Sequence, residues 1–173
     1  MTGPVFLEGD EVNLQTIEEE DIDFLQKNIN RPDVRRFLTV RKPINKAQQM
    51  DFFEEVISSE EDVHLAVCSE DQITGIISLE EAEDVRTASI GLWISPQHQK
   101  NGYGTEAVKL ITEYGFKELN YHRIYARAYE NNRGSQRIWE KLGFEKEGEL
   151  REQTYYNGEF RDIYMYGILD DEW

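Results

Sequence analysis

The segment SPQHQKNGYGTEAVKLI, residues 95–111, places two glycines directly before an apolar pattern with helical spacing. Pro96 prevents the preceding apolar strand from simply continuing, and Gln99, Gly102 and Gly104 lead into the helix. Glycines let the backbone approach a bulky anion, and the first turn of a helix has N–H groups without partners in the helix. The helix dipole adds about 1 kcal/mol in favour of negative charge. The segment therefore predicts a pyrophosphate-binding turn, although an ordinary tight turn before a helix has a similar composition.

A second segment, ENNRGSQRIWEKLGF at residues 130–144, predicts a short helix with polar residues at its start. Asn132 and Ser135 stand at the beginning, Trp139 follows inside, and Gly143 suits the left-handed position after the last turn. Taken alone, Ser135 is an ordinary helix cap and Trp139 an ordinary packing residue. The first segment also lacks the lysine of a P-loop and the third glycine of the dinucleotide fingerprint, which disfavours both of those alternatives.

Together, in this order and spacing, the two segments resemble the GNAT family of N-acetyltransferases. WISPQHQKNGYGTEAV (93–108) is similar to the family's acetyl-CoA pyrophosphate loop, and NNRGSQRIWEKLGFEKEGELRE (131–152) to its closing strand–helix segment. The resemblance covers roughly residues 7–169. It is strongest to the branch of ribosomal-protein N-terminal acetyltransferases and spermidine N-acetyltransferases, in which NGEFRDIYMYGIL (157–169) also has a counterpart.

The resemblance implies acetyl-CoA as co-substrate and assigns its contacts. A strand end would bind the pantetheine arm, the glycine loop would wrap the pyrophosphate, and two helix-start residues would lie near the thiol. In that order the residues are Leu92, Trp93 and Ile94; Gln99, Lys100, Asn101, Gly102, Tyr103, Gly104 and Thr105; and Asn132 and Ser135.

The implied reaction is a direct attack of an amine on the thioester in a ternary complex. An ammonium cannot attack, so a base must accept its proton; Glu80 is our candidate, against the alternative that it is a solvated glutamate of LEEAED. The Ile94 amide is the candidate donor for the developing oxyanion. Trp139 occupies the position where many family members have a tyrosine that protonates the leaving thiolate, and an indole cannot give up its proton near neutral pH. That leaves water, Tyr129 or no group for this step.

The expected architecture is α+β, a GNAT fold in one N-acetyltransferase domain spanning residues 1–173. Alternation and helical periodicity predict a mixed central sheet of about seven strands, flanked by about four helices, and the resemblance implies that the sheet is splayed at the cofactor site. Asn157-Gly158 predicts a tight hairpin turn. The strands are expected at residues 11–17, 64–69, 73–82, 87–95, 123–129, 149–156 and 159–169, and the helices at 18–29, from 45 onward, at 103–119 and at 135–142.

Composition narrows the choice of partners and compartment. Nineteen Lys and Arg stand against thirty-five Asp and Glu, a net charge of −16, which repels nucleic acids and anionic membranes. The acidity is either a device for solubility or an attraction for cations. The N-terminal residues lack a signal-peptide pattern, so we expect a cytoplasmic protein. Cys68 is the only cysteine, and His64, His98 and His122 show no metal-ligand spacing, so no metal is expected.

Residues 31–46 form a basic island with six basic residues and one acidic residue. It is either a solvated face or the lining of a site for an anionic ligand, and in the second case Arg31, Arg35 and Arg36 would bind the substrate. An acidic-flanked peptide or protein N-terminal α-amine is therefore the leading acceptor, because like charges oppose a polyamine. A small amine (polyamine or antibiotic) and a non-catalytic acyl-CoA sensor are the alternatives. The edge of the C-terminal hairpin would also allow a homodimer.

Overall fold

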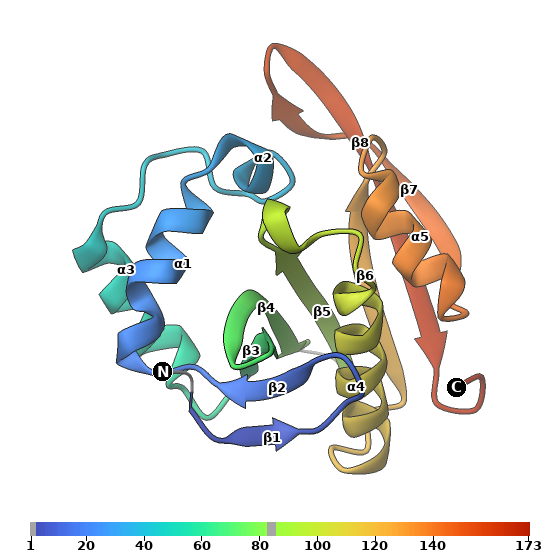
Figure 1. Cartoon of the computed structure of the whole chain (residues 1–173). Helices are drawn as coiled ribbons and strands as arrows, with labels where there is room; N and C mark the ends of the chain where they lie inside the picture. Colours follow the sequence, from blue (N-terminus) through green and yellow to red (C-terminus); the bar gives the residue numbers. More distant parts are fainter. Residues whose placement is uncertain (1–2, 83–85) are drawn as a thin grey trace.

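The computed structural model describes residues 3–82 and 86–173, and over these ranges the chain forms eight strands and five α-helices (Figure 1). The strands are β1 (Val5–Leu7), β2 (Asn13–Thr16), β3 (Val63–Ser69), β4 (Gln72–Glu81), β5 (Thr87–Ile94), β6 (Arg123–Tyr129), β7 (Glu145–Tyr156) and β8 (Glu159–Leu169). The helices are α1 (Ile22–Ile29), α2 (Pro32–Arg35), α3 (Lys46–Phe52), α4 (Tyr103–Lys117) and α5 (Arg133–Lys141).

The strands form one sheet in the order β1-β2-β3-β4-β5-β6-β8-β7. All neighbours are antiparallel except β5 and β6, which are parallel and joined by the crossover helix α4. The predicted α+β fold with a mixed central sheet is confirmed. The short strand β1 and the four-residue helix α2 were not predicted, because elements of three or four residues are too short to show a hydrophobic period.

The splay between the two central strands is visible in the pairing. β5 and β6 pair only over Thr87–Ile90 and Arg123–Ala126. Beyond Ile90, the last four residues of β5 continue to pair with β4 on one side and have no strand partner on the other. A wedge-shaped gap therefore opens between β5 and β6, as the resemblance implied.

The two faces of the sheet carry different helices. The larger core, which includes Ile90, Ile111 and Trp139, lies on the side of α4 and α5. The smaller core, around Leu25, Ala66 and Cys68, lies on the side of α1 and α3. Because side chains alternate along a strand, the odd-numbered residues at the end of β5 face α1 and α3, and the even-numbered ones face α4.

Local signals set the helix boundaries. Asn45 caps α3, because its side chain accepts from the Gln48 amide while Gln48 reaches back to the Asn45 amide. The first helix differs from the prediction, since a 3₁₀ turn at residues 19–21 precedes α1 and its capping box uses Glu18. The predicted hairpin turn is confirmed, with positive φ angles of 54° at Asn157 and 83° at Gly158.

The hairpin of β7 and β8 ends the sheet, and β7 begins at Glu145, four residues earlier than expected. In the part of the chain described, β7 pairs on one side only. The homodimer suggested by this edge stays a prediction. No helix among the described residues is long and apolar enough to cross a membrane.

Candidate active site

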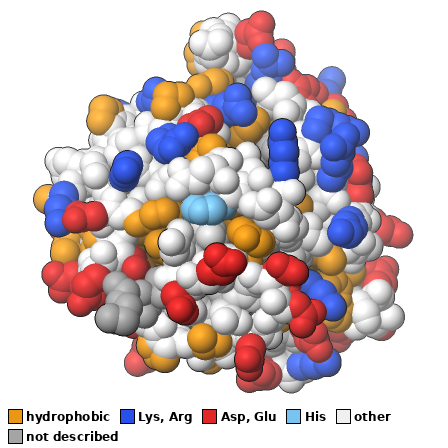
Figure 2. Space-filling model, in the orientation of Figure 1, with side chains coloured by type: hydrophobic (Ala, Val, Ile, Leu, Met, Phe, Trp, Pro, Cys, Tyr) orange, Lys and Arg blue, Asp and Glu red, His pale blue; other side chains and the backbone are white. Residues whose placement is uncertain are grey.

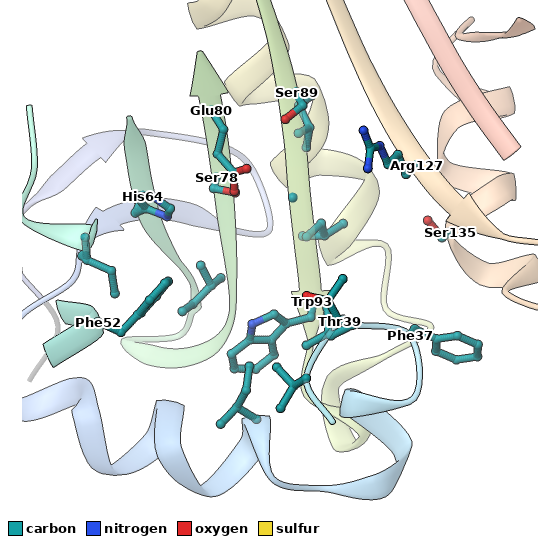
Figure 3. A pocket seen from close by; sticks show the side chains of 18 of the residues that line it. Phe37, Thr39, Phe52, His64, Ser78, Glu80, Ser89, Trp93, Arg127 and Ser135 are labelled. Carbon is teal, nitrogen blue, oxygen red and sulfur yellow. The ribbon is translucent and has the colours of Figure 1, made fainter. Parts of the chain in front are cut away.

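A cavity of about 900 Å³ lies where β5 leaves β6, on the side of the sheet that carries α1 and α3 (Figure 3). β4 and β5 form its wall on one side, and Arg127, Tyr129, Ser135 and Trp139 lie across the gap. Helices α1 and α3 and residues 37–40 enclose the other end. Of the predicted site residues, the cavity brings together Glu80, Leu92, Trp93, Ser135 and Trp139.

Glu80 forms a polar pair with Ser78 inside this cavity. The two residues share one face of β4, and the Ser78 hydroxyl donates to Glu80 Oε1 at 2.8 Å. Ser78 stands opposite Gly91 of β5, and Glu80 stands opposite Ser89. Gly91 is the first residue past the last β5–β6 pair, so the carboxylate lies beside the point where the gap opens.

A side chain at Gly91 would disturb the Ser78–Glu80 pair. A Cβ added there would lie 2.6 Å from Ser78 Oγ and 3.5 Å from Glu80 Oε1. The absence of a side chain therefore leaves space for the carboxylate beside the strand. Ser78 and Gly91 were not singled out from the sequence, although the alternation in ITGIISLEE places Ser78 on the same face as Glu80.

The backbone of β5 offers two N–H groups to the gap. The Ser95 amide donates to the Thr74 carbonyl on the β4 side at 2.8 Å. Since amides alternate in direction along a strand, the Leu92 and Ile94 amides point toward the side that β6 has left. Leu92 lies closer to the opening of the gap, and Ile94 closer to the glycine loop.

The glycine loop fits a bound phosphate group. Lys100 and Gly102 have φ angles of 68° and 87°, which turn successive amides inward. The first helical amides, of Thr105 and Glu106, both donate to the Gly102 carbonyl. Within the described residues, the backbone amides of positions 100–104 donate no hydrogen bond to the chain. Five free donors at the start of α4 make this loop a suitable cradle for a pyrophosphate.

Side chains hold the loop against the strand end. Gln99 Nε2 donates to the Ile94 carbonyl at 2.9 Å, and Ser95 Oγ lies 2.7 Å from His98 Nδ1. The predicted residues Asn101, Tyr103, Gly104 and Thr105 lie in or directly after this loop. These contacts hold the glycine loop against the end of β5.

The start of α5 forms the far wall. Asn132 Oδ1 accepts from the Ser135 amide at 3.2 Å, so Asn132 is the helix cap. The Trp139 indole N–H donates to Ser135 Oγ at 3.0 Å, and the ring packs against Phe144. With only 2% of its surface exposed, Trp139 is part of the core as well as of the cavity wall. Its one donor is already used within its own helix.

Tyr129 stands at the end of β6, past the last residue that pairs with β5. Its hydroxyl donates to the Leu38 carbonyl at 3.3 Å and lies 3.4 Å from a guanidinium nitrogen of Arg41. Arg41 also donates to Thr154 at 3.2 Å, which connects the loop after α2 to the C-terminal hairpin. One residue of the basic island therefore contacts the rim of the site.

The three arginines expected to bind substrate do not line the cavity. Arg31 forms an ion pair with Asp33 at 3.1 Å, and the Arg36 guanidinium lies over the Phe37 ring. Arg35 Nε is buried without a partner among the described residues. In Figure 2 most Lys and Arg side chains of the visible face lie in its upper half, over α2 and α5, and most Asp and Glu side chains lie below.

No group of three or more His, Cys, Asp or Glu residues in the described ranges is arranged to hold a metal ion.

The GNAT acetyltransferase domain matches residues 11–145, and the chain belongs to this family of N-acetyltransferases. It is 30% identical over 163 residues to the spermidine N(1)-acetyltransferase of Escherichia coli K12, covering 94% of this chain and 88% of the relative. It is 35% identical over 102 residues to the putative ribosomal N-acetyltransferase YdaF of Bacillus subtilis, covering 58% and 56%. The fold matches the crystal structure of spermidine N-acetyltransferase from Vibrio cholerae in complex with CoA and spermine, with a TM-score of 0.88, 22% identity and coverage of 95% and 98%.

Proposed function

We propose that this N-acetyltransferase transfers the acetyl group of acetyl-CoA to a primary amine of a small molecule, by direct attack with Glu80 as general base. The observation that carries the proposal is the Ser78–Glu80 pair at the opening of the gap between β5 and β6. At this position the carboxylate reaches an amine that approaches from the α1–α3 side. The unpaired backbone amides of the glycine loop and of the end of β5 lie at the other end of the gap.

The residues present fit acetyl-CoA. Leu92 and Ile94 would hold the pantetheine arm, and the amides of positions 100–104 would hold the pyrophosphate. The bound co-substrate supplies an acyl group already activated as a thioester. In place of the Ile94 amide expected from the sequence, the Leu92 amide, which lies nearer the opening of the gap, would stabilise the charge that develops on the carbonyl oxygen. The Ile94 amide would then serve the pantetheine.

Each proton step has a candidate group in this chain. Glu80 accepts the proton of the attacking amine, while the Ser78 hydroxyl keeps the carboxylate oriented toward the gap. Tyr129 is our candidate for the proton that the leaving thiolate takes up, because it lies in the cavity wall and its hydroxyl would exchange the long bond to the Leu38 carbonyl for the thiolate. Trp139 stands where many members of the family have a tyrosine, and here it serves as a packing residue.

Two observations favour a small amine over a peptide N-terminus. The arginines on which the peptide acceptor depended lie outside the cavity, and among the described residues the charged side chains in its lining are Glu80, Glu81 and Arg127. The acceptor end is also enclosed by α1, α3 and residues 37–40, which suits a compact substrate. The relative that aligns with 94% of this chain is named as a spermidine N(1)-acetyltransferase, and spermidine is a small amine.

The test is a thiol-release assay with acetyl-CoA and matched acceptors, namely short alkylamines, diamines, spermidine, and peptides with acidic or neutral first residues. Higher kcat/KM for the small amines supports the proposal. Preference for an acidic-start peptide would contradict it and restore the basic island as a substrate site. An Arg36→Gln variant serves as control, because our account predicts unchanged acceptor preference when this arginine is neutralised.

A further inference from the structure

His64 is a cavity residue that the reaction described above does not use. It lies on β3, directly across from Ser78 of β4 in the strand pairing, and Ser78 in turn holds Glu80. Figure 3 shows the imidazole on the same face of the sheet as Ser78 and Glu80, one strand away. His64 is therefore a neighbour of the proposed base within the wall that encloses the acceptor.

The imidazole has no hydrogen-bond partner among the residues that the structure describes. Its Nε2 atom is buried and unpaired, and no described residue bonds to either ring nitrogen. The ring packs edge-on against Phe52 of α3, with centroids 6.2 Å apart. Folded proteins seldom retain a buried polar atom without a partner, so a ring nitrogen in a cavity wall that bonds no described residue is available to a molecule bound in the cavity.

Neighbouring polar groups narrow what this ligand can be. Gln49 lies one helical turn before Phe52 on α3, lines the same cavity, and its side-chain amide is not bonded within the described chain. Burial lowers the pKa of His64, and the carboxylates of Glu80 and Asp62 oppose this shift without cancelling it. The imidazole is therefore neutral near neutral pH, and it offers one donor and one acceptor without repelling an ammonium.

Resting on the function proposed above, we propose that His64 binds the acceptor directly, through a hydrogen bond to a second polar group of an amine whose reacting nitrogen lies at Glu80. Glu80 is a diagonal neighbour of His64, but its carboxylate is held at Ser78, the residue directly across from His64. Because neighbouring strands are about 4.8 Å apart, the second group lies about 5 Å from a reacting nitrogen held at this carboxylate. An extended three-carbon chain spans this separation. The substrate class is therefore a small amine with a hydroxyl or second amino group three carbons away.

The test compares three acceptors of equal length: propylamine, 3-aminopropan-1-ol and 1,3-diaminopropane. We expect wild type to prefer the two acceptors with a second polar group by about tenfold in kcat/KM. His64→Leu abolishes this preference, because kcat/KM for the two acceptors with a second polar group falls toward the value for propylamine. His64→Gln, which keeps a donor and an acceptor, restores part of it.

The matched control is His122→Leu, because His122 is a surface residue that pairs with Asp170 at 2.9 Å and lies outside the cavity lining. This variant keeps the wild-type preference. CoA binding by calorimetry and thermal unfolding show whether each variant is folded and binds the co-substrate. A preference that survives in His64→Leu, or an equal loss on all three amines, would overturn the role of His64 while the transferase stands. Absence of thiol release by wild type with every amine would refute the proposed function, and the inference with it.

Discussion

Replacement of Glu80 by glutamine is the perturbation that most specifically removes the proposed base. The substitution keeps the shape of the side chain. It also keeps an oxygen that can accept the hydrogen bond of the Ser78 hydroxyl, which in the wild type joins Ser78 Oγ to Glu80 Oε1 at 2.8 Å. It removes only the ability to accept a proton. Glu80 is exposed and forms no ion pair in the described chain, so the fold does not depend on its charge.

The expected loss follows from the role of a positioned base. General-base catalysis contributes about 10²–10⁴-fold, so kcat for a small amine should fall by about a hundredfold or more, equivalent to about 2.7 kcal/mol of activation free energy. Ser78→Ala removes the orienting hydrogen bond and should cost much less, since the carboxylate remains. Both variants should bind CoA as the wild type does, because neither residue belongs to the glycine loop.

The assay is thiol release at saturating acetyl-CoA, measured at several pH values. With Glu80→Gln the rate should recover partly as pH rises, because the free amine becomes more abundant without help from a base. Glu118→Gln, at the exposed end of α4, is the control for loss of one surface carboxylate. A Glu80→Gln enzyme with wild-type kcat at neutral pH would refute the assignment of Glu80 as base.

Three further predictions concern the loop, the indole and the buried imidazole. Gly102→Ala places a side chain at a φ of 87°, and its control Gly158→Ala places one at a φ of 83°, with open space around both. Each substitution should lower the free energy of unfolding by about 1 kcal/mol, but only Gly102→Ala should raise the KM for acetyl-CoA. Trp139→Tyr should leave kcat within about threefold and lower the unfolding free energy by about 1–3 kcal/mol, because a smaller ring fills a packed site; a markedly higher kcat would show that thiolate protonation is limiting. Because the pKa of His64 is lowered in the folded chain, the stability linked to it is complete above its ordinary value of 6.5 and is lost as pH falls through the folded pKa. Thermal unfolding at about pH 7.5 and about pH 5.5 should therefore show a smaller acid-induced decrease in His64→Leu than in wild type, and an equal decrease would contradict this.

Local chemistry made much of the fold predictable from sequence. The glycine turn before α4, the Asn45 cap of α3 and the Asn157-Gly158 hairpin each depend on a few adjacent residues. The strand β1 and the helix α2 were not predicted, because they are held by pairing and packing with distant segments rather than by their own pattern.

The site was predictable where one segment builds it and not where several segments meet. The loop after β5 follows from its own glycines. The relation of His64 to Ser78 and Glu80 depends on the register of β3 against β4, which the sequence does not state. Whether Arg31, Arg35 and Arg36 line the cavity depends on how α2 packs, which the charge composition does not determine.

The central claim is acetyl transfer from acetyl-CoA to a small amine, and mass spectrometry of the amine after reaction with the purified chain tests it most directly. Our account predicts one mono-acetylated amine for every thiol released, at a rate that depends on both substrates with intersecting initial-velocity lines. Thiol release without an acetylated amine, or bound CoA with neither product, would contradict it.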